Sequence, residues 1–347
     1  MPPARFLFPL PIPVVPPARF LFPLSIPVVP PAHFGNCLPI APIPSRATRR
    51  CVTIACMSKL SVFLPQFASS AMPAVNDGIA VVTGASSGIG RAVAAALANP
   101  SSPDAPRFTV IGTSRHPENI ENPLPNVEYL PLDLEDPASI DALAAEVLRR
   151  GTPAVLVNNA GESQSGPLEE LPHEALTRLF QLNVLGQIQL TQKLLPAMRA
   201  AGAGRITMVG SMLGSFPLAF RSSYVASKAA LKGFAFAGRR EVRPFGVNIS
   251  VMEPGSINTG LSARRTKYID MEGPYRTEFS TMLRRLDRNE SNGISAERVA
   301  EEILKSITDH RPRPLYATGS MAPIIFPLSR VLPRETVHWI IGRKHGL

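Results

Sequence analysis

The chain has 347 residues, including 37 prolines and three cysteines, and a formal net charge of +10 at pH 7. The cysteines (Cys37, Cys51 and Cys56) all lie near the N-terminus, so the rest of the sequence contains neither a disulfide framework nor a cysteine zinc site. The six histidines are scattered without a metal-ligand spacing, and we predict no metal cofactor.

Residues 1–78 differ in composition from the rest and are predicted to form a separate leader. Residues 2–15 recur almost unchanged as residues 16–29, and their frequent prolines exclude a membrane-spanning helix and favour polyproline II or disorder. No acidic residue precedes Asp77, whereas six Lys or Arg residues do, which leaves about +4 for the remainder of the chain. The basic balance is therefore largely a property of the leader, and no nucleic-acid partner is predicted.

The end of this leader has the composition of a targeting segment. Residues 45–56 are basic, rich in hydroxyl groups and free of acids, which is typical of an organellar transit peptide. We therefore predict import into a plastid or another organelle, with cleavage before about residue 75. The alternatives are translation from Met57 or Met72, and a cytoplasmic or membrane-associated protein.

From residue 79 to residue 347, apolar runs alternate with helical patterns. Continuous apolar runs are typical of parallel strands that are buried on both faces. They lie near 79–83, 108–113, 127–132, 153–158, 205–210, 247–252 and 314–317, and helical patterns lie near 88–98, 137–150, 173–201, 222–242 and 296–310. Ser295, followed by Glu297, predicts the start of the last of these helices. The alternation predicts one α/β domain, a Rossmann-type doubly wound parallel sheet with helices on both faces.

A glycine-rich turn joins the first strand to the first helix. Gly84, Gly88 and Gly90 follow a G-x-x-x-G-x-G spacing. Glycines let the backbone turn tightly and approach a pyrophosphate at the N-terminus of the helix, where free N–H groups and the helix dipole favour an anion. The turn therefore predicts a dinucleotide site.

Two later strands also end in polar residues. The strand near 153–158 runs into Asn159, Ala160 and Gly161, and the strand near 205–210 is followed by Ser211. The carboxyl ends of parallel strands are where open α/β sheets bind ligands, so these residues are predicted to lie at the same site.

Tyr224 and Lys228 stand four residues apart at the start of a predicted helix. Residues at i and i+4 share a helix face, so the ammonium group is expected near the phenol, where it would lower the pKa of the tyrosine. A phenol of lowered pKa can transfer a proton near neutral pH. Taken alone, the same spacing is also typical of a solvated helix face.

Together with Pro254 and Gly255, these motifs resemble the short-chain dehydrogenase/reductase family from about Ile79 to the C-terminus. The resemblance implies hydride transfer between a nicotinamide and a carbonyl or alcohol carbon. It implies that Tyr224 is the acid/base, that Lys228 lowers its pKa and holds the nicotinamide ribose, that Ser211 binds the substrate oxygen, and that Asn183 completes a proton relay. It implies cofactor contacts from Gly84, Ser86, Ser87, Gly88, Ile89, Gly90, Ser114, Arg115, Asp133, Asn159, Ala160, Gly161, Tyr224, Lys228, Pro254, Gly255, Ile257 and Thr259.

The second strand predicts which nicotinamide cofactor is preferred. An acidic residue at its end would bind the ribose 2′-hydroxyl, whereas an arginine would attract a 2′-phosphate. The strand ends in Ser114 and Arg115, with no carboxylate before Glu118. We therefore predict NADP(H) rather than NAD(H). Asp133 resembles the acid of the family that contacts adenine, or alternatively caps the helix that starts near Pro137.

Two segments are predicted to shape the substrate site. Residues 256–293 form the expected lid, in which Tyr268, Met271 and Tyr275 would suit a bulky apolar substrate, as would Phe279 and Met282 unless these two lie on the core face of a helix. The tail, residues 318–347, resembles that of hydroxysteroid and retinol dehydrogenases. It is expected to pack on the domain, to close over the pocket or to lie on a membrane surface.

We therefore predict a small apolar carbonyl or alcohol substrate, such as a steroid, a retinoid or another lipid. The alternatives are a 3-oxoacyl-acyl-carrier-protein reductase, which the long tail disfavours, and a non-catalytic cofactor-binding scaffold. The family resemblance further implies a homodimer or homotetramer, associated through the helices expected at 173–201 and 222–242.

Overall fold

The computed structural model describes residues 71–100, 102–260 and 264–347. The predicted leader lies outside the described residues except for 71–78, and so do the three cysteines. The predictions made for that segment therefore stay predictions.

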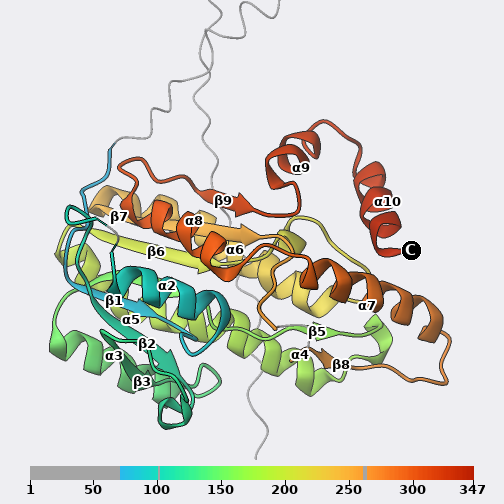
Figure 1. Ribbon diagram of the computed structural model, residues 1–347, viewed down its shortest axis with the longest axis horizontal. Coiled ribbons are helices and arrows are strands. Elements are labelled where there is room, and N and C mark those ends of the chain that lie inside the picture. The colour runs from blue at the N-terminus through green and yellow to red at the C-terminus, as the bar shows by residue number, and fades with distance from the viewer. Residues whose placement is uncertain (1–70, 101, 261–263) are drawn as a thin grey trace, which may run out of the picture. The chain divides into compact units, whose positions relative to one another are not determined.

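The predicted parallel sheet is confirmed. Seven strands pair in the order β3-β2-β1-β4-β6-β7-β9, and all of the pairs are parallel. Their bounds are β1 (Ile79–Val82), β2 (Thr109–Ser114), β3 (Val127–Pro131), β4 (Pro153–Asn158), β6 (Gly204–Val209), β7 (Val247–Pro254) and β9 (Leu315–Thr318). The strand order reverses between β1 and β4, so the connections leave these two neighbours in opposite directions (Figure 1). A crevice at the carboxyl ends of the strands is expected at such a point.

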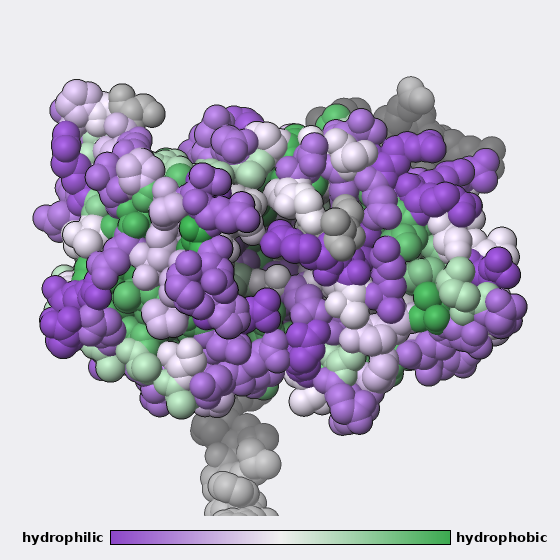
Figure 2. Space-filling model, turned by 60° about the horizontal axis from the view of Figure 1, so that its bottom comes forward, coloured by the Kyte–Doolittle hydropathy of each residue, from purple (hydrophilic) through white to green (hydrophobic). Residues whose placement is uncertain are grey.

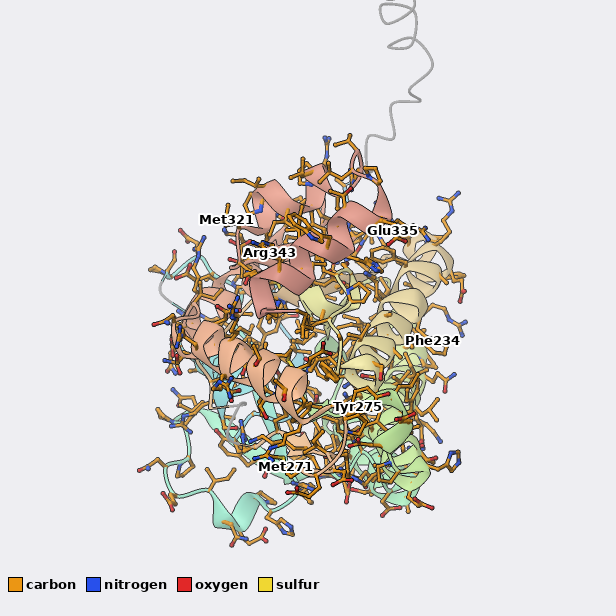
Figure 3. The ribbon with its side chains drawn as sticks, turned by 90° about the vertical axis from the view of Figure 1, so that its right-hand side faces the viewer. Phe234, Met271, Tyr275, Met321, Glu335 and Arg343 are labelled. Atoms are coloured by element: carbon orange, nitrogen blue, oxygen red, sulfur yellow. The ribbon has the colours of Figure 1, made fainter. Side chains whose placement is uncertain are left out.

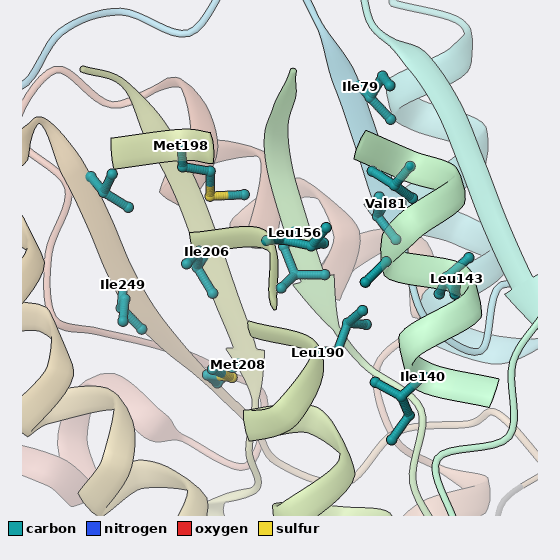
Figure 4. Close-up of a cluster of buried hydrophobic side chains, with 14 of the residues drawn as sticks. Ile79, Val81, Ile140, Leu143, Leu156, Leu190, Met198, Ile206, Met208 and Ile249 are labelled. Atoms are coloured by element: carbon teal, nitrogen blue, oxygen red, sulfur yellow. The ribbon is translucent and has the colours of Figure 1, made fainter. Parts of the chain in front are cut away.

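Helices cover both faces of the sheet. Their bounds are α2 (Gly88–Ala98) and α8 (Ala296–Thr308) on one face, and α3 (Pro137–Arg150), α5 (Gly186–Ala200) and α6 (Ser222–Val242) on the other. Alternate side chains of β1 enter the two resulting cores, Ile79 and Val81 on the side of α3 and α5, and Ala80 and Val82 on the side of α2 (Figure 4). This alternation explains why the strands are apolar throughout. The face of the molecule shown in Figure 2 is, by contrast, largely hydrophilic.

The caps of two helices test the starts that the sequence predicts. Ser295 is the N-cap of α8, where its side chain accepts a hydrogen bond from the Arg298 N–H. The cap of α3 is Asp136 and not Asp133, because the Asp136 side chain accepts from the Ala138 N–H at 2.9 Å. The capping alternative for Asp133 is therefore wrong.

The single long helix predicted over 173–201 is interrupted. The chain forms α4 (His173–Phe180), then a π-helical turn η3 (Gln181–Leu185), and then α5. Such turns insert an extra residue into a helix and often occur at functional sites. Asn183, the predicted relay residue, lies in the middle of this turn.

The remaining elements build the substrate side of the domain. A two-stranded sheet joins β5 (Gln164–Ser165) to β8 (Thr266–Lys267), and three helices follow: α7 (Arg276–Ser291), α9 (Ala322–Leu328) and α10 (Arg334–His345). The short helical turns are η1 (Pro117–Asn119), η2 (Leu168–Glu170), η4 (Met212–Gly214) and η5 (Arg243–Phe245).

The C-terminal tail leaves the sheet abruptly after β9. Gly319, Ser320 and Met321 have φ values of 79°, 44° and 59°, three successive left-handed residues that turn the chain out of the sheet. The following helix packs on η4, and the rings of Phe216 and Phe326 meet edge to face with centroids 4.9 Å apart. The predicted packing of the tail on the domain is thus confirmed for this inner side.

Candidate active site

A cavity of about 700 Å³ opens at the carboxyl edge of the sheet. It is bordered by the turn between β1 and α2, by the ends of β2, β4, β6 and β7, and by the C-terminal helices. The structure brings all of the predicted site residues to this cavity except Gly90 and Asn183, which lie behind its wall. The predicted motifs, which span Gly84 to Thr259 in the sequence, therefore form one site.

The glycine-rich turn has the geometry that its sequence predicts. Gly84 and Gly88 have φ values of +66° and +53°, which favour glycine. A Cβ atom on Gly90 would lie only 2.3 Å from the carbonyl oxygen of Gly84, so only glycine fits there without a shift of the backbone. This compact turn at the start of α2 leaves room for a pyrophosphate, and the residues present fit a dinucleotide.

Asn159 holds that turn from the neighbouring strand. Its Nδ2 donates to the carbonyl oxygens of Thr83 at 2.9 Å and Gly84 at 3.3 Å. In return, the Thr83 hydroxyl accepts from the backbone N–H groups of Asn159 and Ala160 at 2.9 and 3.0 Å. The amide that the sequence placed at the cofactor therefore also shapes the loop that would receive it.

Ser114, Arg115 and Asp133 lie at the side of the cavity formed by β2 and β3. Arg115 is exposed, whereas the Asp133 carboxylate is half-buried and accepts from the Glu135 N–H at 2.9 Å. An exposed guanidinium at the end of the second strand is placed to meet an anionic group of a bound ligand.

Tyr224 and Ser211 meet in the wall of the cavity. The phenol is buried, with 7% of the residue exposed, and hydrogen-bonds to the Ser211 hydroxyl. Ser211 stands directly after β6, where its Oγ also accepts from the Leu213 N–H at 3.2 Å. A hydroxyl and a phenol thus point to one spot, which is the arrangement needed to bind and protonate a carbonyl oxygen.

Lys228 lies one turn along α6 from Tyr224, with its Nζ 5.9 Å from the ring centroid. The ammonium group is buried and donates to the Val209 carbonyl at 2.9 Å. Because burial disfavours the charged form, the pKa of Lys228 falls to about 8. The predicted shared helix face is therefore confirmed in its geometry.

A second cation, which sequence reasoning missed, lies closer to the tyrosine. The Cζ of Arg221 is 4.5 Å from the ring centroid of Tyr224. Burial raises the pKa of the phenol, while the Arg221 charge and the hydrogen bond from Ser211 oppose this rise. The sequence assigned the lowering of the pKa to Lys228, whereas the geometry places Arg221 against the ring. The available signal was an arginine three residues before the tyrosine, at the start of the predicted helix, where it serves as the N-cap of α6.

Arg221 is itself almost completely buried. Its Nη1 and Nη2 donate to the hydroxyls of Ser165 and Ser163, each at 2.9 Å. Burial lowers the pKa of its guanidinium to about 10. Within the described residues no carboxylate lies within 4 Å of it, so the two serines hold a charge that no ion pair neutralises.

Asn183 reaches the site from behind. Its Nδ2 donates to the Glu162 carbonyl at 3.0 Å and to the Ser227 hydroxyl at 3.2 Å, and its Oδ1 accepts from the Glu162 N–H at 2.8 Å. A Cβ atom on Gly161 would lie 3.0 Å from Asn183 Oδ1 and 3.5 Å from Lys228 Nζ. Because Gly161 has no side chain, the Asn183 amide and the Lys228 ammonium group can both approach the same position beside it.

The substrate side differs from the sequence expectation. Of the predicted lid residues, the cavity wall includes none of the five aromatic and methionine side chains (Tyr268, Met271, Tyr275, Phe279 and Met282). Phe279 and Met282 instead form a separate buried cluster with Leu218 and Leu286, so the alternative reading as a core face is confirmed for these two. An apolar cavity wall is present, but its side chains come from η4 and the C-terminal tail.

From the lid, Arg264 does reach the cofactor side, where its Nη1 donates to the Ser87 hydroxyl at 3.1 Å.

Among the described residues, no group of three or more His, Cys, Asp or Glu side chains is placed to hold a metal ion.

Comparison with known proteins places these features in a family. The short chain dehydrogenase family profile matches residues 78–269. An uncharacterized oxidoreductase of Bacillus subtilis, YusZ, is 33% identical over 284 residues, which cover 78% of this chain and 99% of that protein. A 3-ketodihydrosphingosine reductase of Bacteroides thetaiotaomicron is 29% identical over 73% of this chain and 91% of its own length. Human 17-beta-hydroxysteroid dehydrogenase type 1 is 36% identical over 53% of this chain and 58% of its own length.

Solved structures agree with these relatives. A short-chain dehydrogenase from Streptomyces avermitilis has a TM-score of 0.65 and 32% identity, over 77% of this chain and 97% of its own. A metagenomic short-chain oxidoreductase in complex with NADP has a TM-score of 0.54 and 26% identity, over 70% of this chain and 96% of its own. The chain therefore belongs to the short-chain dehydrogenase/reductase family of oxidoreductases, and within it resembles the hydroxysteroid dehydrogenases.

Proposed function

We propose that this protein is an NADP(H)-dependent reductase or dehydrogenase of an apolar, lipid-like carbonyl or alcohol. The observation that carries the proposal is that Ser211 and Tyr224 line the same cavity as the glycine-rich turn and an apolar wall. That wall contains Leu213, Phe216, Ile325, Leu328, Leu332, Val337, Ile340 and Ile341. Walls of this kind select apolar ligands, while a few polar groups fix their orientation.

The glycine-rich turn and Lys228 would hold the nicotinamide cofactor, which when bound would supply the hydride that adds to the carbonyl carbon. The electron pair of the C=O bond would then move to the carbonyl oxygen. The Ser211 hydroxyl donates a hydrogen bond to that oxygen as negative charge develops. The Tyr224 O–H bond breaks and its proton passes to the oxygen, which completes the alcohol. Lys228 and Arg221 then face the phenolate, and their charges stabilise it until it is protonated again.

The preference for NADP(H) rests on Arg115. It borders the cavity at the end of β2, where a ribose 2′-phosphate is expected, and no acidic residue lies between the start of β2 at Thr109 and Glu118. The related metagenomic enzyme was solved with NADP, which supports the same choice.

The substrate class rests on the tail and on the relatives. One relative is named for a long-chain keto lipid and another for a steroid, both of them apolar ketone or alcohol chemistry. An acyl-carrier-protein reductase is less well supported, because here the tail occupies the wall of the cavity. Organellar import and dimer or tetramer formation remain proposals, which cell fractionation and analytical ultracentrifugation would test.

The first experiment measures NADPH oxidation by the full chain with long-chain ketones, steroid ketones and retinal, beside the Tyr224→Phe variant. We expect turnover of at least one apolar ketone, and a loss of at least roughly 100-fold in the variant, because its proton donor is gone. Cofactor binding, followed by NADPH fluorescence, should be nearly equal in the two proteins. Equal turnover by both would refute the role of Tyr224, and binding without turnover of any ketone would favour a scaffold.

A further inference from the structure

Exposed apolar side chains gather on the two C-terminal helices. Half of the large exposed apolar side chains of the described residues lie at or beyond Met321, a segment of 27 residues. Val331 is 77% exposed, Trp339 63% and Ile324 57%. Large apolar groups gathered in this way mark a binding surface rather than ordinary surface variation. We name the outer side of α9 and α10, with its exposed residues Met321, Ile324, Leu328, Val331, Trp339 and Ile340, the tail surface.

The tail surface is also basic. Arg330, Arg334, Arg343 and Lys344 are all exposed, and Glu335 is the only acidic residue after Met321. The guanidinium of Arg343 stands 5.8 Å from the ring of Trp339, so a cation and the largest apolar group lie together. Figure 3 shows Met321, Glu335 and Arg343 at the two terminal helices in the upper part of the view, and Phe234 below them on α6. Apolar side chains interspersed with cations complement the acyl chains and anionic headgroups of a lipid surface.

The tail surface is continuous with the cavity. Leu328 and Ile340 are 44% exposed and also border the cavity, so the same two side chains face outward and inward. Behind them, Ile325 and Ile341 continue the apolar wall toward Phe216. An apolar molecule could therefore move from the outer surface to Tyr224 along a continuous row of apolar side chains, without being exposed to water.

The charge of the tail surface and the lengths of its helices favour a membrane surface over a second copy of the chain or a membrane-spanning helix. A second copy of this surface would bring four cations against four others across a two-fold axis, with one acid on each side, which is repulsive. Within the described part of the chain, no helix is long and apolar enough to span a bilayer. Helices of 7 and 12 residues with exposed apolar and basic groups instead suit the interface between headgroups and acyl chains.

We propose that the tail surface docks on anionic phospholipid membranes and that an apolar substrate enters the cavity directly from the bilayer. The docking stands independently of the reaction, whereas the route of substrate entry rests on the proposed function.

The chain carries its own probe for this contact, because Trp339 is its only tryptophan. The full-length protein is mixed with vesicles of phosphatidylcholine alone, or of phosphatidylcholine with phosphatidylserine. We expect a blue shift of Trp339 emission and its quenching by brominated lipids, stronger with phosphatidylserine and weakened by salt. Co-sedimentation measures the same binding and includes any contribution from the leader.

Matched variants assign the binding to the tail surface. Ile324→Ser with Val331→Ser removes two exposed side chains that do not border the cavity, and should weaken vesicle binding by roughly tenfold or more. The control is Phe234→Ser with Phe236→Ser, which removes two similarly exposed apolar groups from α6 and should leave the emission shift unchanged. Arg330→Glu with Arg334→Glu should abolish the preference for phosphatidylserine. Circular dichroism melting verifies that each variant is folded.

Three results would overturn the proposal. Sedimentation of the protein with vesicles without any change in Trp339 emission would place the contact elsewhere in the chain. The emission could shift with protein concentration in the absence of lipid, together with a doubled mass, which would make a second copy the occupant. The tail and control variants could also bind vesicles equally well.

Activity is measured separately so that the two proposals can fail independently. With a long-chain ketone presented in vesicles, the Ile324→Ser/Val331→Ser protein should lose turnover, and with the same ketone dispersed in detergent it should match the parent. Vesicle binding without turnover in either form would leave the docking intact and refute the proposed reaction. Equal turnover of vesicle-borne ketone by the parent and the variant would refute entry from the bilayer.

Discussion

The guanidinium of Arg221 stacks on the ring of Tyr224, with its Cζ 4.5 Å from the ring centroid. Both side chains are buried at the cavity, and two serine hydroxyls hold the arginine in place. The charged groups that face the phenol are Arg221 at the N-cap of α6, Lys228 within α6, Arg265 from the lid and Glu290 of α7. Arg265 forms ion pairs with Glu290 and Asp287 at 2.6 Å, whereas among the described residues neither Arg221 nor Lys228 has a carboxylate within 4 Å. Of these two cations, Arg221 lies closer to the ring.

Replacing Arg221 by methionine should raise the pKa of the Tyr224 phenol further, because an opposing positive charge is lost. Ketone reduction needs the protonated phenol, so its rate falls at alkaline pH as the phenol ionises. In the variant this alkaline limb of the pH–rate profile should move to higher pH, by roughly one unit. Ultraviolet titration of the phenol, with Tyr224→Phe as the blank, checks the same shift without turnover. Ser165→Ala removes one bond to the guanidinium but keeps its charge, and should leave the limb nearly in place. An unchanged limb in Arg221→Met would show that the arginine acts only on structure.

Lys228 should cost the folded protein stability at neutral pH. Its pKa is about 8 in the folded state, against an ordinary value of 10.5, so between these values the unfolded chain binds more protons and the free energy of unfolding rises with pH. At pH 7 both states are protonated and the full cost of burial is present. Lys228→Met should therefore be more stable than the parent at pH 7, by an amount on the order of 1–3 kcal/mol, less the lost bond to Val209.

Urea unfolding at pH 7 and at about pH 9.5 checks this prediction, since the advantage of Lys228→Met must shrink as the parent lysine loses its proton. A difference between the two proteins that is the same at both pH values would contradict it. The cofactor must be absent, because its binding would stabilise the parent preferentially.

Gly90→Ala should damage the cofactor site specifically. The new Cβ would lie 2.3 Å from a backbone oxygen of Gly84, so the turn must shift, and we expect NADPH affinity to fall by roughly tenfold or more. Gly233→Ala is the matched control, because no atom lies within 4 Å of its Cβ position in α6. That change should stabilise the helix by about 0.5–1 kcal/mol. NADPH fluorescence titration and thermal melting distinguish the two effects, and unchanged affinity in Gly90→Ala would argue against a pyrophosphate at this turn.

Arg115→Ala should weaken NADPH and leave NADH binding nearly unchanged. A charge-assisted hydrogen bond from arginine to a phosphate contributes about 1.5–3 kcal/mol, which corresponds to a loss of roughly 10- to 100-fold. Titration of both cofactors against the parent and the variant measures the ratio of their affinities. Should the parent bind NADH as tightly as NADPH, the assignment of Arg115 to a 2′-phosphate would fail.

The sequence by itself determined the fold class, the order of the strands along the chain and most of the residues that meet at the cavity. This was possible because the signals are local: unbroken apolar runs for buried strands, glycine spacing for the turn before α2, and the four-residue step that places Tyr224 and Lys228 on one helix face. Parallel strands then bring residues such as Asn159 and Ser211 to the same edge without further information.

Only the tertiary structure decided what surrounds those residues. The apolar wall comes from η4 and from α9 and α10, more than 100 residues apart in the sequence, and not from the aromatic residues of the predicted lid. The stacking of Arg221 on Tyr224 depends on Ser163 and Ser165, which lie just before β5 and within it, far from Arg221 in the sequence. The interruption of the long helix at Asn183 likewise depends on bonds to Glu162 and Ser227. The hydrophobic periodicity of one element predicts which of its side chains are buried, but not which side chains of another element they contact. Such contacts depend on how the elements pack against each other.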